Sequence, residues 1–282
     1  MMPQASFGRA QRKEQSMQSL QQKAAELLES KRAAVVIGYA EGSDGRVRPH
    51  FARTADAAAA FVWDQRCKQN LAVYLTKTEI KKMGPAAVIA SPAVVRTIVQ
   101  LASEQQFAKS FPITLVVEND QVTELADAAS LDAFAVSHAV LFPPHVTKEI
   151  EDLAAMSVTE RFVFWQNELS RCFKCYACRS ACPLCYCTNC ITESNQPQWV
   201  SVAPHALGNF EWHINRAMHL AGRCIQCGSC TLACPAGIPI ALLTIEATNI
   251  VEREFKYQAG IKSDAPAALS SFMVDDKEVF IR

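Results

Sequence analysis

The chain has 282 residues, of which 50% are hydrophobic and 20% are charged. This balance is that of a folded protein with room for two domains, so a largely disordered chain is excluded. Lys and Arg together number 28, as do Asp and Glu, so no net basic charge favours nucleic acid or an anionic membrane. The apolar runs are strand-sized, well below the ~20 residues that span a bilayer. With no apolar stretch after the N-terminal charges, we expect a cytoplasmic protein without an integral membrane segment.

The first part of the chain predicts helices alternating with strands. An amphipathic helix is expected over 15–30, and a strand over 33–40 leads through a turn at Gly42 and Gly45 into a returning strand at 46–51. A helix capped by Thr54 or Asp56 is predicted over 57–67, and it is followed by strands over 71–76 and 86–90. A helix from Pro92 to about residue 106 and a strand over 113–118 complete the pattern. Such alternation is typical of a small α/β domain, placed here at 33–147 after an N-terminal arm and helix at 1–32.

Cysteines set the second part apart. Of the twelve cysteines, eleven lie between Cys172 and Cys234, among helices predicted over 148–171, 208–220 and 239–255. Cytosolic thiols stay reduced, so a dense group of them indicates metal binding or redox chemistry rather than disulfides. Residues 148–260 are therefore predicted to form a separate metal-binding domain, followed by an extended tail at 261–282.

Two cysteine runs share one spacing, which is the pattern of bacterial ferredoxins that bind 4Fe-4S clusters. In this pattern three thiolates of a run hold one cluster, and the fourth cysteine, before a proline, reaches the neighbouring cluster. The first cluster would take Cys172, Cys175, Cys178 and Cys234, and the second would take Cys224, Cys227, Cys230 and Cys182. Structural zinc is disfavoured because it prefers two separated cysteine pairs.

Four cysteines remain outside these sets. Cys185, Cys187 and Cys190 directly follow the first run, and Cys67 is the only cysteine outside the 172–234 stretch. Together they could ligate a third 4Fe-4S cluster, with Cys67 joining the α/β domain to the cysteine loop. The alternatives are spare buried thiols in the loop and an ordinary buried cysteine at position 67.

The segment from Arg171 to Cys190 resembles the β subunits of formate dehydrogenases and of deazaflavin-coenzyme-reducing hydrogenases of anaerobes. It is also similar to the ferredoxin-like subunits of heterodisulfide-reductase-type complexes. Segments 61–74 and 82–106 share the resemblance, which extends over about 33–275. Flavin-binding members carry Gly-Cys-Asp after the strand around Val88, where this chain has Ile89-Ala90-Ser91-Pro92. This departure counts against FAD and a deazaflavin site.

These observations predict an α/β N-terminal domain joined to a dicluster bacterial-ferredoxin-like α+β module. The expected function is single-electron transfer within a multisubunit oxidoreductase of anaerobic metabolism. The resemblance implies redox partners of the formate dehydrogenase, hydrogenase, flavin oxidoreductase or heterodisulfide reductase type. The helix at 15–30 and the tail after Gly260 are candidate docking arms. The alternatives are a flavin-containing β subunit acting on a deazaflavin or nicotinamide coenzyme, and a scaffold whose clusters never change oxidation state.

Other candidate residues carry weaker patterns. The histidines near the second run are interpreted as surface or packing residues rather than ligands, and the nearby tryptophans as shields that keep water from the sulfurs. The histidines are His205, His213 and His219, and the tryptophans are Trp165, Trp199 and Trp212. No catalytic constellation and no Gly-rich dinucleotide motif stand out, so no catalytic or organic cofactor-binding residue is assigned.

Overall fold

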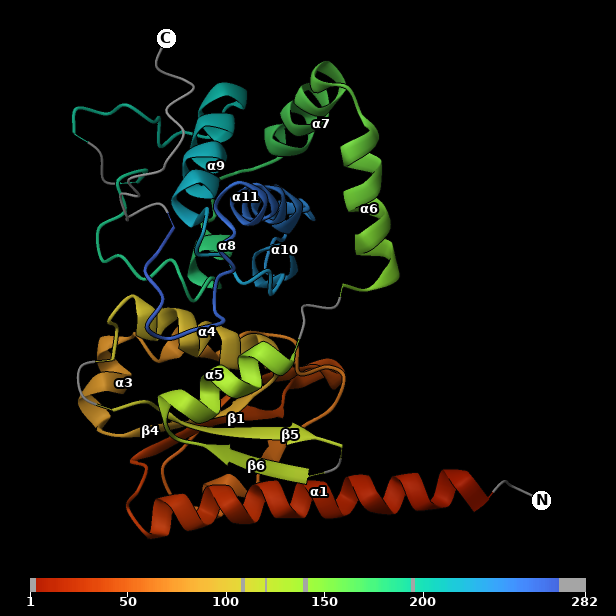
Figure 1. Cartoon of the computed structure of the whole chain (residues 1–282), viewed down its shortest axis with the longest axis vertical. Coiled ribbons are helices and arrows are strands. Elements are labelled where there is room, and N and C mark those ends of the chain that lie inside the picture. Colours follow the sequence, from red (N-terminus) through yellow and green to blue (C-terminus); the bar gives the residue numbers. More distant parts are fainter. Residues whose placement is uncertain (1–3, 108–109, 120, 139–141, 194–195, 269–282) are drawn as a thin grey trace.

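The computed structural model describes residues 4–107, 110–119, 121–138, 142–193 and 196–268, with side chains from residue 15 onward. Figure 1 shows a sheet with helices on both faces in the N-terminal half and a group of helices and loops in the C-terminal half. The long helix α4 lies between the two halves. Among the described helices, none is both long and apolar enough to cross a lipid bilayer.

One mixed sheet organises the N-terminal half. In the described part of the chain its strands are β1 (Val35–Glu41), β2 (Val47–Ala52), β3 (Phe61–Val62), β4 (Ala86–Ala90), β5 (Ile113–Glu118) and β6 (Gln121–Leu125). The order is β2-β1-β4-β5-β6, and β3 pairs with the end of β1 on the edge opposite β2. Strands β1, β4 and β5 run parallel, whereas β2, β3 and β6 are antiparallel to their neighbours. The N-terminal region is therefore α/β, as predicted.

Helices cover both faces of this sheet because its central strands are apolar on both sides. On one face lies α1 (Gln4–Glu29), whose Leu20, Ala24 and Leu27 pack against Val36 and Ile89. The other face carries α4 (Pro92–Ser103), α5 (Ala128–Ser137) and the one-turn helix η2 (Leu71–Tyr74). The remaining short elements are η1 (Ser43–Gly45), α2 (Ala55–Ala58) and α3 (Thr78–Met83).

Two secondary-structure predictions in this half are wrong. The helix expected over 57–67 stops at Ala58, because the apolar Phe61–Val62 segment pairs with β1 instead. The strand expected over 71–76 is the 3-10 helix η2, started by the Asn70 side chain, which accepts a hydrogen bond from the Ala72 amide at 3.1 Å. The helix predicted over 15–30 packs its apolar stripe into the core, and its role as a docking arm stays a prediction.

The C-terminal half is built from helices and loops. Its helices are α6 (Pro144–Ala155), α7 (Val158–Ser170), α8 (Ala177–Ser180), α9 (Ala206–Leu220), α10 (Ser229–Leu232) and α11 (Ile240–Phe255). A capping box between Ser157 and Glu160 starts a new helix within the predicted 148–171 stretch. An α+β module was expected, but the described residues beyond 144 contain no strand. The two cysteine loops lead into one-turn helices rather than a hairpin.

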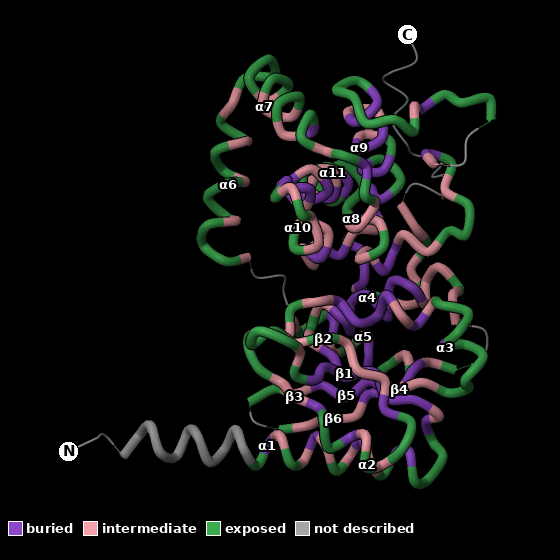
Figure 2. Tube along the Cα trace, turned by 180° about the vertical axis from the view of Figure 1, so that it is seen from behind, coloured by how far each residue is buried: buried purple, intermediate pink, exposed green. Residues whose placement is uncertain are grey.

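Helix α4 joins the two halves and is buried on both sides, as the purple tube in Figure 2 shows. Leu101 packs against Leu184, Leu220 and Ile225 of the C-terminal half. Glu104, just beyond the end of α4, pairs with Arg223 at 2.6 Å. The segment after α11 also returns to this junction, where the Gly260 amide donates to Gln100 at 2.9 Å. The second half is thus anchored on α4 through both apolar and ionic contacts.

The predicted extended tail begins as part of this junction. The Ser263 amide donates to the carboxylate of Asp132 on α5 at 3.0 Å. Gly260 has a φ of +72°, and a Cβ atom there would lie 2.4 Å from the Arg96 carbonyl oxygen, so only glycine fits this close approach. The start of the segment assigned as a docking arm therefore packs onto the fold, and residues 269–282 lie outside the described part.

Candidate metal centres

The two cysteine runs have the same backbone conformation. Lys174 and Gln226, each two residues after the first cysteine of a run, have φ values of 53° and 62°. Tyr176 and Gly228, each after the second cysteine, have φ values of 58° and 73°. Each loop then enters a one-turn helix, α8 or α10, before the fourth cysteine. The sequence repeat is therefore a repeat of three-dimensional structure.

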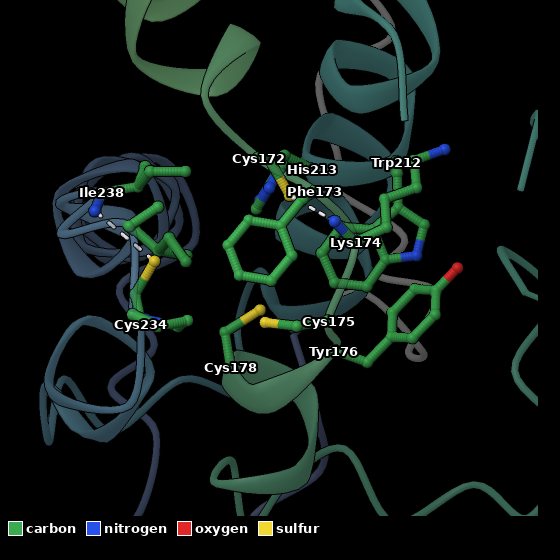
Figure 3. A pocket seen from close by; sticks show the side chains of 13 residues that line it. Cys172, Phe173, Lys174, Cys175, Tyr176, Cys178, Trp212, His213, Cys234 and Ile238 are labelled. Carbon is green, nitrogen blue, oxygen red and sulfur yellow. Dashed lines mark hydrogen bonds between the residues drawn. The ribbon is translucent and has the colours of Figure 1, made fainter. Parts of the chain in front are cut away.

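The first cavity lies between the first cysteine loop and the chain after α10, and it is partly open to solvent. Figure 3 shows the side chains that surround it, among them Phe173, Trp212 and His213. The cysteines at its wall are Cys172, Cys175 and Cys178 of the first run and Cys234 of the second. Three thiols of one run and the last thiol of the other thus meet at one space.

The second cavity has the reciprocal lining. Its cysteines are Cys224, Cys227 and Cys230 of the second run and Cys182 of the first. Both cavities therefore group the cysteines as the ferredoxin spacing predicts. Within the described part of the chain, no three His, Cys, Asp or Glu side chains are placed to hold a single metal ion.

Backbone amides face the cysteine sulfurs in both loops. The Lys174 amide donates to Cys172 Sγ at 3.3 Å, and the Gln226 amide donates to Cys224 Sγ at 3.4 Å. The Ile238 amide donates to Cys234 Sγ at 3.4 Å, as the dashed line in Figure 3 marks. Such N–H···S bonds stabilise negative charge on sulfur and help set the reduction potential of iron–sulfur clusters.

Hydrogen-bond donors without protein partners test whether the two cavities suit a sulfur-rich cluster. Trp212 Nε1 and both ring nitrogens of His213, one of which carries a hydrogen, are buried without a partner, and both residues line the first cavity. Arg216 Nε is buried without a partner, and Arg216 lines the second cavity. Orphaned buried donors are costly unless a bound group accepts from them. A 4Fe-4S cluster, with its sulfides and thiolates, fits these walls.

Burial also controls the protonation of the thiols. It raises the pKa of Cys178 to about 11 and the pKa of Cys230 to about 12. These thiols are therefore neutral at pH 7 without metal, and ligation must displace their protons. The imidazole of His213 is neutral too, because burial lowers its pKa to about 4. A neutral imidazole presents one N–H donor and one acceptor to the first cavity.

The four cysteines proposed for a third cluster are more dispersed than those around the two cavities. Cys185 is half-buried beside Cys182, Cys187 is exposed, and Cys190 contacts the Thr192 hydroxyl at 3.1 Å. Cys67 packs against the core below α4, and its Sγ lies 3.7 Å from the Val62 carbonyl oxygen. Burial raises the pKa of Cys67 to about 11. Its contacts in the described structure involve none of the three loop cysteines, so its ligation remains a prediction.

The flanking histidines and tryptophans have diverse roles. His205 accepts the Gly208 amide at 3.2 Å as the cap of α9, and Trp199 is 76% exposed rather than a shield. The sequence interpretation gave no role to Arg216, although it lies on the buried stripe of α9 that also carries Trp212, His213 and Leu220. A cation within the apolar face of a helix between two cysteine runs is the signal that could have found it.

The sheet domain is thus joined to two reciprocal four-cysteine cavities whose donor sets suit iron–sulfur clusters. Residues 168–238 match the 4Fe-4S dicluster domain family, and this range contains both cysteine runs. The match confirms a ferredoxin-like dicluster domain in this part of the chain.

Two curated relatives are similar over part of the chain. The F420-dependent formate dehydrogenase subunit beta of Methanocaldococcus jannaschii is 32% identical over 102 residues, which are 36% of this chain and 26% of the relative. The F420-dependent formate dehydrogenase 1 subunit beta of Methanococcus maripaludis is 31% identical over 105 residues, which are 37% of this chain and 26% of the relative. The match spans about a quarter of these relatives. The resemblance predicted from the sequence is confirmed over this part.

Proposed function

We propose that this chain is the iron–sulfur electron-transfer subunit of a multisubunit oxidoreductase and relays single electrons through two 4Fe-4S clusters. One observation carries the proposal: each cavity is lined by three cysteines of one run and the fourth of the other. Reciprocal ligation holds two clusters close together, and short separation is what electron transfer between clusters requires. An isolated structural site would need no second copy.

Each cluster would supply one-electron oxidation and reduction, and the chain's residues would tune and position it. The ligand sets would be Cys172, Cys175, Cys178 and Cys234 for one cluster and Cys224, Cys227, Cys230 and Cys182 for the other. The backbone amides and buried donors around the cavities would lower the cost of added negative charge. The walls of both cavities are mostly apolar, which strengthens these electrostatic interactions.

The two sites differ in their access to solvent. At the first cavity Cys175 is exposed and Phe173 is 56% exposed. At the second cavity Ser229 is buried and accepts the Asn70 amide of the sheet domain at 3.2 Å. We propose that electrons enter or leave at the first site, and that the second site communicates with the sheet domain.

The partners are proposed from the relatives, which are named as formate dehydrogenase β subunits. A redox partner of the formate dehydrogenase, hydrogenase, flavin oxidoreductase or heterodisulfide reductase type would supply or receive the electrons. The cytoplasmic location expected from the sequence stays a prediction. The competing assignment is a flavin-containing oxidoreductase β subunit, whose coenzyme would bind in the sheet domain.

Anaerobic purification from the native organism tests the proposed function. We expect at least about eight irons per chain, since each cluster holds four, together with reversible bleaching by dithionite and co-elution with a second redox subunit. A flavin absorption band would favour the competing assignment. Clusters that dithionite does not reduce would indicate a scaffold, and elution only as a free monomer would contradict the subunit role.

A third cluster at Cys185, Cys187, Cys190 and Cys67 makes a separate prediction. If it forms, the intact protein should contain about twelve irons per chain, since each cluster has four irons. The iron content of Cys67→Ala should fall towards about eight per chain. The measurement is iron per chain in both proteins after anaerobic purification. Eight irons in both would leave Cys67 as an ordinary buried cysteine of the sheet domain.

A further inference from the structure

Arg216 of α9 is a buried cation without a carboxylate partner. Its exposed fraction is 5%, and none of the ion pairs among the described residues includes it. Burying an arginine without an opposite charge is strongly unfavourable. The fold therefore needs another source of negative charge next to this guanidinium, and the cysteines are the groups that surround it.

The guanidinium lies between the two cavities. It lines the second cavity beside Cys182, Cys224 and Cys230. Towards the first cavity, one of its terminal nitrogens donates to the carbonyl oxygen of Cys178 at 3.2 Å. Its carbon Cζ lies 6.0 Å from the ring centroid of Trp212, which lines that first cavity. The guanidinium of an arginine keeps its positive charge in proteins, so this buried site holds a permanent cation.

Other buried cations near the cysteines are placed differently. Lys174 lines the first cavity, and its ammonium donates to the Ser201 carbonyl. Arg96 of α4 donates to the Ala259 carbonyl at 2.7 Å and lines neither cavity. Arg216 is the cation at the wall of the second cavity, and its Nε has no protein partner.

We propose that Arg216 is a positioning residue that holds positive charge between the two cluster sites and raises the reduction potential of the second-cavity cluster. This inference rests on the proposed function. Reduction adds one negative charge to a cluster, and a fixed cation in a low-dielectric site stabilises the reduced form. The effect on the first cluster is smaller, because Arg216 lines the second cavity and not the first.

The test is an EPR-monitored redox titration of the iron-loaded chain with Arg216→Gln and Arg216→Lys. We expect Arg216→Gln to lower one midpoint potential by the equivalent of a tenfold or greater fall in the reduced-to-oxidised ratio, about 59 mV for one electron. Arg216→Lys keeps the charge and restores most of the shift. Arg253→Gln is the matched control on the exposed face of α11, and it should leave both potentials unchanged.

The outcomes separate this inference from the proposed function. A wild-type chain without reducible 4Fe-4S clusters would contradict the proposed function itself. Wild-type clusters whose potentials stay the same in Arg216→Gln would overturn only the role of Arg216. Iron retained in Arg216→Lys but lost in Arg216→Gln would support the role of charge. Loss of iron in both variants would show that arginine's shape is needed, which contradicts the proposal.

Discussion

Removing Cys175 together with Cys234 is expected to abolish one cluster and leave the other intact. These two cysteines come from different runs and are 59 positions apart in the sequence, yet both line the first cavity. The variant Cys175→Ala/Cys234→Ala would leave that cavity with two thiols, too few to hold a cubane. It should lose about four irons per chain, since each cluster contains four, and the second cluster should keep its potential.

The matched variant Cys175→Ala/Cys182→Ala also removes two thiols, but one from each cavity. Both clusters would keep three thiolates, so we expect two damaged clusters with the EPR signal of oxidised three-iron species. Iron content and EPR of the oxidised proteins distinguish the variants. The exchange of fourth cysteines is contradicted if the Cys175/Cys182 variant retains one intact cluster and the Cys175/Cys234 variant damages both.

Glu104→Gln is expected to destabilise the junction between the two halves by about 3 kcal/mol, the cost of removing one partner of a buried ion pair. The Glu104 side chain is 11% exposed, and it accepts hydrogen bonds from Arg223 at 2.6 and 2.7 Å and from Tyr186 at 2.7 Å. Because Arg223 precedes Cys224, this pair fixes the start of the second cysteine loop on α4. The midpoint of anaerobic thermal denaturation should fall by roughly 6–10 °C.

The control for Glu104 is the exposed pair of Arg253 and Glu254 on α11, with side chains 64% and 56% exposed. Glu254→Gln should change stability by about 1 kcal/mol or less, as solvent and salt screen such pairs. Equal effects of the two substitutions would show that the Glu104 pair does not anchor the junction.

The same pair makes stability depend on pH. Burial pushes the pKa of Glu104 up, but the hydrogen bonds and charge of Arg223 outweigh it, so the pKa lies below its ordinary value of 4.5. A carboxyl with a lowered pKa stabilises the fold above its unfolded pKa, and this contribution is lost as pH falls through the folded value. The difference in denaturation midpoint between the wild type and Glu104→Gln should be constant above pH 5 and shrink below about pH 4.5.

Parts of the fold follow from local sequence alone. The β-branched runs at 33–40 and 113–118 predict β1 and β5, and Ser91-Pro92 predicts the start of α4. The apolar run at 71–76 was misassigned as a strand, since a short apolar run does not distinguish a strand from a buried helical turn. The segment forms a helical turn because the Asn70 side chain caps it and its apolar residues are buried below α4.

The sequence by itself determined the chemistry of this protein, because cysteine spacing is a local property of the chain. Two repeated runs indicated the dicluster domain and the grouping of Cys182 and Cys234 that the cavities display. Only the tertiary structure decided which charges and donors face those cavities. Arg216 is placed between the sites, and Glu104 beside Arg223, by packing between segments distant in sequence. Such contacts depend on how α4 and α9 dock, and no local pattern encodes that docking.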